Sequence, residues 1–121
     1  MSGLTTHVLD TAQGRPAGGM KLELFRLEGA ARTLLKSVIT NQGGRTDEPL
    51  IAGGELAAGV YELVFDVAGY FADTGADIGL PLSQPTFLGS VPIRFGIADA
   101  DAHYHVPLLV SPWAYSTYRG S

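Results

Sequence analysis

The sequence predicts an all-β domain, and three observations lead to this expectation. Hydrophobic and polar residues alternate with a two-residue period in several short runs, which is typical of strands with one buried face. The 16 glycines and 7 prolines are spread along the chain and separate these runs as turns do. The length of 121 residues is too short for two separate cores, so we expect one domain, residues 1–121.

Three strands are expected in the first third of the chain. Residues 4–10 form a short β-prone run that contains His7. Residues 20–26 place Leu22 and Leu24 on one face and charged side chains on the other. Residues 31–40 are predicted as a strand because β-prone residues dominate the end of the run. The glycine-rich segments between the runs are interpreted as turns and not as phosphate-binding loops.

Residues 60–97 predict two strands with a short helix between them. Residues 60–67 alternate, with four apolar side chains on one face: Tyr61, Leu63, Phe65 and Val67. Residues 69–73 could form a helix of one or two turns. Residues 91–97 alternate again, and Pro92 suits the beginning of a strand or an edge strand because it lacks a backbone N–H.

The last part of the chain predicts a strand whose two faces are both largely apolar or carry candidate functional residues. In residues 103–111, Val106, Leu108 and Val110 form one face, while His105, Pro107 and Leu109 form the other. In a small sandwich such a strand packs one face on its own core. The other face then needs a second cover, which could be a ligand or another subunit. The aromatic, β-prone residues 113–118 strengthen the second possibility, so we expect a homo-oligomer built through the last two strands.

Composition excludes several classes of partner and site. The net charge of -4, without a cluster of basic residues, disfavours nucleic acid and anionic membranes as partners. The absence of cysteine removes disulfides, thiolate metal sites and a cysteine nucleophile, and it suits a reducing compartment. There is no apolar run long enough for a signal peptide or a membrane helix. The default expectation is a cytoplasmic protein.

The three histidines are the first candidates for chemistry. His103 and His105 lie two residues apart on a predicted strand, so their side chains share a face, as a metal chelate or an acid–base pair requires. The sequence alone does not decide whether His7 joins them, and any single histidine can equally be an ordinary solvated side chain. A three-histidine zinc site remains open as an alternative. A serine nucleophile is disfavoured because no G-x-S-x-G elbow occurs.

Motifs at both ends of the chain resemble those of the 5-hydroxyisourate hydrolases, a transthyretin-like family. The motifs are LTTHVLD at 4–10 with GRPA at 14–17, GRTD at 44–47, VPIRF at 91–95, and HYHVPLL at 103–109 followed by YSTYRGS at 115–121. They cover nearly the full length. The closing tetrapeptide at 118–121 is the most specific, because transthyretin hormone carriers of the same fold lack it. Trp113 departs from the tyrosine that is commoner after Ser-Pro.

The resemblance implies a transthyretin-like, eight-stranded β-sandwich with one short helix, assembled as a homotetramer with a central channel. It implies cofactor-free, metal-free hydrolytic ring opening of a small molecule, 5-hydroxyisourate, in purine breakdown. The residues that match the family's motifs are the catalytic His7, Arg45 and His105 and the substrate-binding Tyr118, Arg119, Gly120 and Ser121. Residue alternation puts His103 on the face of His105, although it lies near the strand end.

Two other classes of protein remain open. A transthyretin-like carrier would hold a small aromatic ligand in the channel without hydrolysing it, but polar residues suit an oxygen-rich heterocycle better than an apolar hormone. In a purely structural sandwich the histidines and Arg45 would have no function.

Overall fold

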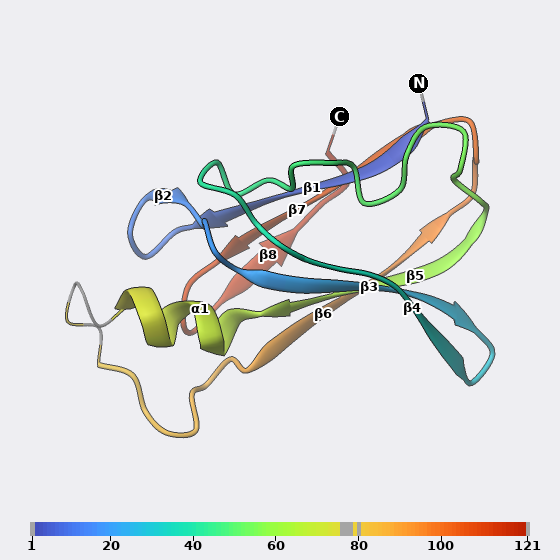
Figure 1. Cartoon of the computed structure of the whole chain (residues 1–121). Coiled ribbons are helices and arrows are strands. Elements are labelled where there is room, and N and C mark those ends of the chain that lie inside the picture. Colours follow the sequence, from blue (N-terminus) through green and yellow to red (C-terminus); the bar gives the residue numbers. More distant parts are fainter. Residues whose placement is uncertain (1, 76–78, 80, 121) are drawn as a thin grey trace.

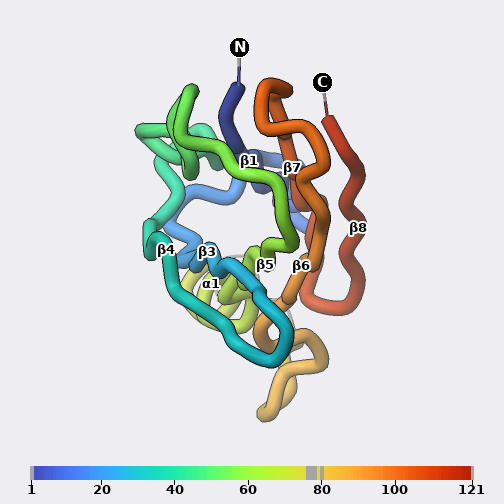
Figure 2. Tube along the Cα trace, turned by 90° about the vertical axis from the view of Figure 1, so that its right-hand side faces the viewer, coloured from blue at the N-terminus to red at the C-terminus, as the bar shows by residue number. Residues whose placement is uncertain are grey.

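The structure is a computed structural model of the chain, and it describes residues 2–75, 79 and 81–120. It confirms the all-β prediction: two four-stranded sheets pack face to face, with one short helix at one end (Figure 1). The first sheet has the order β2-β1-β7-β8 and the second the order β4-β3-β5-β6. Figure 2 shows the two layers nearly end on, with both termini at the same end.

The elements follow the predicted runs closely. They are β1 (Gly3–Asp10), β2 (Arg15–Pro16), β3 (Lys21–Glu28), β4 (Ala31–Ile39), β5 (Gly59–Asp66), α1 (Val67–Thr74), β6 (Ser90–Ile97), β7 (His103–Val110) and β8 (Tyr115–Thr117). Three details differ from the prediction. β2 lies inside a glycine-rich segment that was predicted as a turn, because Arg15 and Pro16 pair with the end of β1. Val67 begins the helix instead of ending a strand, because Asp66 caps the helix by accepting from the Gly69 N–H at 3.0 Å. The closing strand takes only three residues of the aromatic run.

The core lies between the two sheets and is built by the predicted alternation. From the second sheet Leu22, Leu24, Leu63, Phe65 and Val91 are buried, and from the first sheet Leu4, Val8, Val106, Leu108 and Val110. Pro92 lies on β6, which is an edge strand, as its missing N–H requires. Among the described residues, no helix is long and apolar enough to cross a membrane.

The pairing of β1 with β7 determines what the outer face of the first sheet carries. The two strands run parallel over their whole length, so that Thr5 lies opposite His105 and His7 opposite Pro107. The other edge of β1 is covered by the long segment between β4 and β5, which forms single bridges from Ile51 to Leu4 and from Arg45 to His7. The first strand and the second-last strand, β1 and β7, therefore meet in the middle of one sheet.

Candidate active site

The outer face of the first sheet brings all three histidines of the sequence together. Side chains alternate along each strand, so Thr5 and His7 on β1 share this face with His103 and His105 on β7. The Oγ1 of Thr5 lies 2.8 Å from Nδ1 of His105 and 3.2 Å from Nε2 of His103. These distances confirm that His103 and His105 point to the same side. They also identify Thr5, which was not among the predicted site residues.

Arg45 reaches the same face because a tight turn precedes it. The Asn41 side chain accepts from the Gly43 and Arg45 N–H groups at 2.9 and 3.3 Å, and it donates to Asp47 at 3.0 Å. Gly44 has φ +74°, and a Cβ there would collide with the carbonyl oxygen of Val8. This close approach lets the Gly44 carbonyl accept from the Val8 N–H at 2.8 Å, which holds Arg45 beside His7.

The end of the chain returns to His105. The Gly120 N–H donates to the His105 carbonyl at 2.7 Å, and a Cβ on Gly120 would lie only 2.6 Å from Cδ2 of the His105 ring. Only a residue without a side chain fits there while the ring keeps its place. The last residue, Ser121, lies outside the described residues, and its substrate-binding role stays a prediction.

Arg119 and Tyr118 line a cavity of about 340 Å³ between the β6 and β8 edges. The Arg119 guanidinium lies over the Tyr104 ring, 4.2 Å from its centroid, in a cation–π contact. Tyr104 is buried on the core side of β7. In a single chain, Arg119 is thus held on the side of the strand opposite to the histidines, and the predicted substrate contacts of both residues stay predictions.

Burial and positive charge favour the neutral form of the two inner imidazoles. Burial lowers the pKa of His7 below the usual 6.5, and the charge of Arg45 lowers it further. Burial also lowers the pKa of His105, and the charges of Arg45, His7 and His103 add to this effect. A neutral imidazole has a lone pair that can accept a proton from water. The face therefore combines two proton acceptors with a permanently charged guanidinium.

The alternative of a zinc site gains no support from the geometry. Within the described residues, no group of three or more His, Cys, Asp or Glu side chains is arranged to hold a metal ion. The Thr5 hydroxyl is within hydrogen-bonding distance of Nδ1 of His105 and Nε2 of His103. These two nitrogens therefore point to a hydroxyl and not to a shared position for a metal ion.

The family of the chain follows from comparison with known proteins. The family model described as "HIUase/Transthyretin family" matches residues 4–120. The chain belongs to the HIUase/Transthyretin family. "5-hydroxyisourate hydrolase 2" of Rhizobium meliloti is 61% identical over 118 residues, which cover 98% of this chain and 95% of that protein.

Solved structures of both branches of the HIUase/Transthyretin family share the fold. Klebsiella pneumoniae 5-hydroxyisourate hydrolase is 35% identical with a TM-score of 0.78, and the match covers all of both chains. Sea bream transthyretin in complex with thyroxine is 26% identical with a TM-score of 0.82, covering 97% of this chain and 93% of that one. The fold is therefore transthyretin-like, and the architecture alone does not separate a hydrolase from a carrier.

The contact between Gly120 and His105 can be tested with Gly120→Ala. We expect the added Cβ to displace the imidazole, so the NMR signals of the His105 ring should shift. The free energy of unfolding should change by less than about 1 kcal/mol, because the substitution lies outside the core. Gly89→Ala is the matched control, since nothing lies within 4 Å of a Cβ at that position. Unchanged His105 signals in Gly120→Ala would contradict the described contact.

Proposed function

We propose that this chain is a 5-hydroxyisourate hydrolase that opens the ring of its substrate without a cofactor. The observation that carries the proposal is one sheet face on which two imidazoles with lowered pKa values, His7 and His105, lie beside the Arg45 guanidinium. The identity of 61% to the Rhizobium meliloti hydrolase over nearly the whole length supports the same activity. The closing segment, which resembles the hydrolase motif, lies against His105 through Gly120.

The reaction adds water across a carbon–nitrogen bond of the cyclic amide. His7 or His105 removes a proton as the water oxygen attacks the carbonyl carbon, because a neutral imidazole is suited to this near neutral pH. The Arg45 guanidinium stabilises the negative charge that develops on the carbonyl oxygen, through donors fixed in one plane. The carbon–nitrogen bond then breaks, the leaving nitrogen takes a proton, and the product carries a carboxylate.

The carrier alternative is supported by the fold shared with a transthyretin that binds thyroxine. The composition of the face opposes it. Around His7, His105 and Arg45 the outer face of β1 and β7 is polar, whereas an apolar hormone requires a largely apolar lining. Of the apolar side chains of this face, Leu9 and Leu109 lie toward the other end of the strands, and Pro107 lies opposite His7. Tight binding of an apolar aromatic compound without hydrolysis would favour the carrier.

The decay of freshly generated 5-hydroxyisourate, followed by ultraviolet absorbance, tests the activity. We expect the wild-type chain to accelerate the decay, and His7→Gln and His105→Gln to lower kcat by about 100-fold or more, since each removes a proton acceptor. Decay no faster than in buffer, from folded protein, would contradict the hydrolase. Activity that is lost on chelation and restored by zinc would contradict the metal-free reaction.

The dependence of kcat/KM on pH tests the placement of Arg45. Because the pKa values of His7 and His105 are lowered, their proton-accepting forms persist below pH 6.5, and activity should fall only at lower pH. Arg45→Gln removes one of the causes that lower these pKa values, so the acidic limb of the profile should move to higher pH. The variant should also lose about 100-fold in kcat from weaker oxyanion stabilisation.

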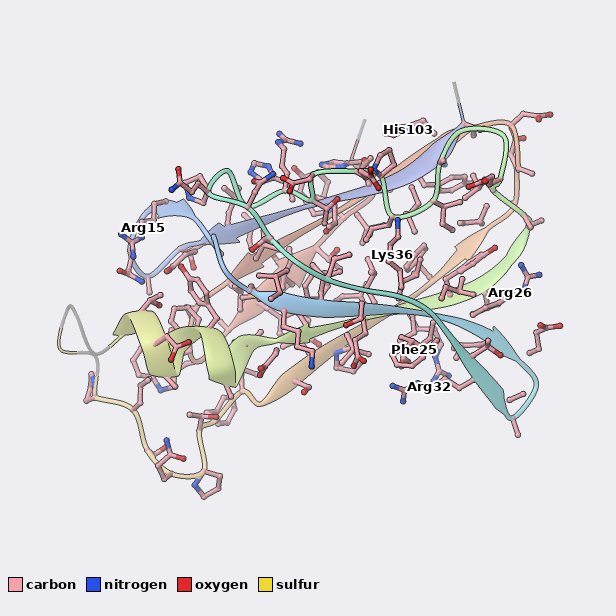
Figure 3. The ribbon with its side chains drawn as sticks, in the orientation of Figure 1. Arg15, Phe25, Arg26, Arg32, Lys36 and His103 are labelled. Carbon is pink, nitrogen blue, oxygen red and sulfur yellow. The ribbon has the colours of Figure 1, made fainter. Side chains whose placement is uncertain are left out.

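Arg32→Gln is the control for this experiment. Figure 3 shows Arg32 on the opposite side of the molecule from His103, and its guanidinium lies over the Phe25 ring at 3.6 Å. This variant should keep the wild-type pH profile. An acidic limb that stays in place in Arg45→Gln would show that Arg45 does not influence the two imidazoles.

We further propose that the chain assembles as a homotetramer built through its last two strands, with a central channel that leaves the histidine face open to solvent. The support is the exposure of large aromatic side chains around the β8 edge: Trp113, Tyr115 and Tyr118. A native mass of four times the 12.7 kDa of one chain is expected in light scattering at micromolar concentration. A sharp monomer mass would contradict this assembly. We also propose a cytoplasmic location, in keeping with the absence of cysteine.

A further inference from the structure

The Thr5 hydroxyl connects two histidines that have different access to solvent. Its Oγ1 lies 2.8 Å from Nδ1 of the half-buried His105 and 3.2 Å from Nε2 of the exposed His103. Both distances are within hydrogen-bonding range. The three groups come from two strands, and the parallel register that sets Thr5 opposite His105 fixes their spacing. The reaction outlined above assigns no task to Thr5 or His103.

A hydroxyl group has a single proton to donate, which restricts the protonation of its two neighbours. If Thr5 donates to one imidazole nitrogen, it must accept an N–H from the other. The tautomers of His105 and His103 are therefore coupled through one oxygen atom. In the arrangement that suits a base at His105, its Nδ1–H donates to Thr5, and the Thr5 hydroxyl donates to His103. Nε2 of His105 then carries the lone pair.

We infer that Thr5 is a positioning residue that selects this tautomer of His105, and that His103 is the group through which a proton leaves the site. The inference rests on the proposed hydrolase function, which it deepens. Thr5 and His103 act through His105 and do not contact the reacting atoms.

The proton balance of the reaction leaves one proton to be removed. One proton of the attacking water goes to the leaving nitrogen, and the other must leave because the product is a carboxylate. His105 takes up a proton at Nε2 and releases its Nδ1 proton to the Thr5 oxygen. The Thr5 hydroxyl proton passes to Nε2 of His103, which then gives its other proton to bulk water. Each group in the path gains and loses one proton. The two imidazoles end in the opposite tautomers and return to the starting ones by exchanging protons with water at Nε2 of His105 and Nδ1 of His103.

The charges around His105 favour movement of the proton outward. Burial lowers the pKa of His105 most, and the charges that face this imidazole lower it further: Arg45 from the segment between β4 and β5, His7 from β1 and His103 from β7. A protonated His105 is therefore a stronger acid than an ordinary histidine. His103 lies at the exposed start of β7, where water stabilises the positive charge.

The test compares Thr5→Val with Thr5→Ser. Valine keeps the β-branched shape and removes the hydroxyl, so the strand should fold while the link is lost. We expect kcat to fall by roughly 10-fold or more, with KM little changed, and Thr5→Ser to recover most of the wild-type kcat. Thr11→Val is the matched control, because its hydroxyl also bonds across the same strand pair, to the Val110 carbonyl at 3.1 Å. It should retain the wild-type kcat.

Two further readouts separate positioning from a merely structural role. Nitrogen-15 NMR should detect the Nδ1–H tautomer of His105 in the wild type and a shift toward the Nε2–H tautomer in Thr5→Val. His103→Gln should have a low kcat in dilute buffer that rises with the concentration of added imidazole buffer, since the buffer replaces the missing proton acceptor. A His103→Gln rate that is independent of buffer would overturn the role of His103.

The outcomes also distinguish this inference from the proposed function. If the wild-type chain hydrolyses 5-hydroxyisourate and Thr5→Val does so at the same kcat with the same His105 tautomer, the inference is wrong and the hydrolase stands. If the wild-type chain is inactive, the hydrolase function is wrong. The proton path from His105 through Thr5 to His103 is then wrong as well, even if NMR confirms the hydrogen bonds between these residues.

Discussion

The parallel pairing of β1 with β7 is the constraint on which the site depends. It joins residues about 100 positions apart, and a slip of one residue would turn the histidines of one strand into the core. The inner faces prevent such a slip, because Leu4, Val8 and Leu108 are fully buried there. Thr6, buried among them, donates to the Val106 carbonyl at 2.7 Å, so its hydroxyl is satisfied in this register.

The parts of the site are held by restraints of different kinds. The histidines lie on strands whose other sides are packed in the core, so their backbone positions are rigid. Arg45 lies on an irregular segment and is held by the Asn41 turn and by the contact of Gly44 with β1. Gly120 is held by one backbone hydrogen bond and by close contact with His105. The proton acceptors His7 and His105 therefore lie on packed strands, whereas the charged Arg45 lies on an irregular segment beside them.

Strands β3, β5 and β6 could be predicted because each alternates between core and solvent, whereas β4 was predicted from its β-prone residues, and glycine-rich turns separate the strands. The pairing of β1 with β7 has no local signal, because it depends on contacts across almost the whole chain, and so the meeting of His7 with His105 came only from family resemblance. The position of Thr5 between two histidines follows from the same register and was missed. Glu62 shows another limit: it points away from the core, yet it is buried beside Arg94, which bonds it at 3.2 Å. Alternation distinguishes the two faces of a strand but not what covers each face.

The hairpin between β3 and β4 has a practical consequence for experiments on this protein. Its tip, residues 28–31, is exposed, turns at a glycine with φ +60°, and lies far from the first sheet (Figure 1). The sequence has no cysteine. A cysteine introduced at Ala30 would thus be a unique thiol on a tolerant loop, where a fluorophore or a surface linker can be attached without contacting the histidine face.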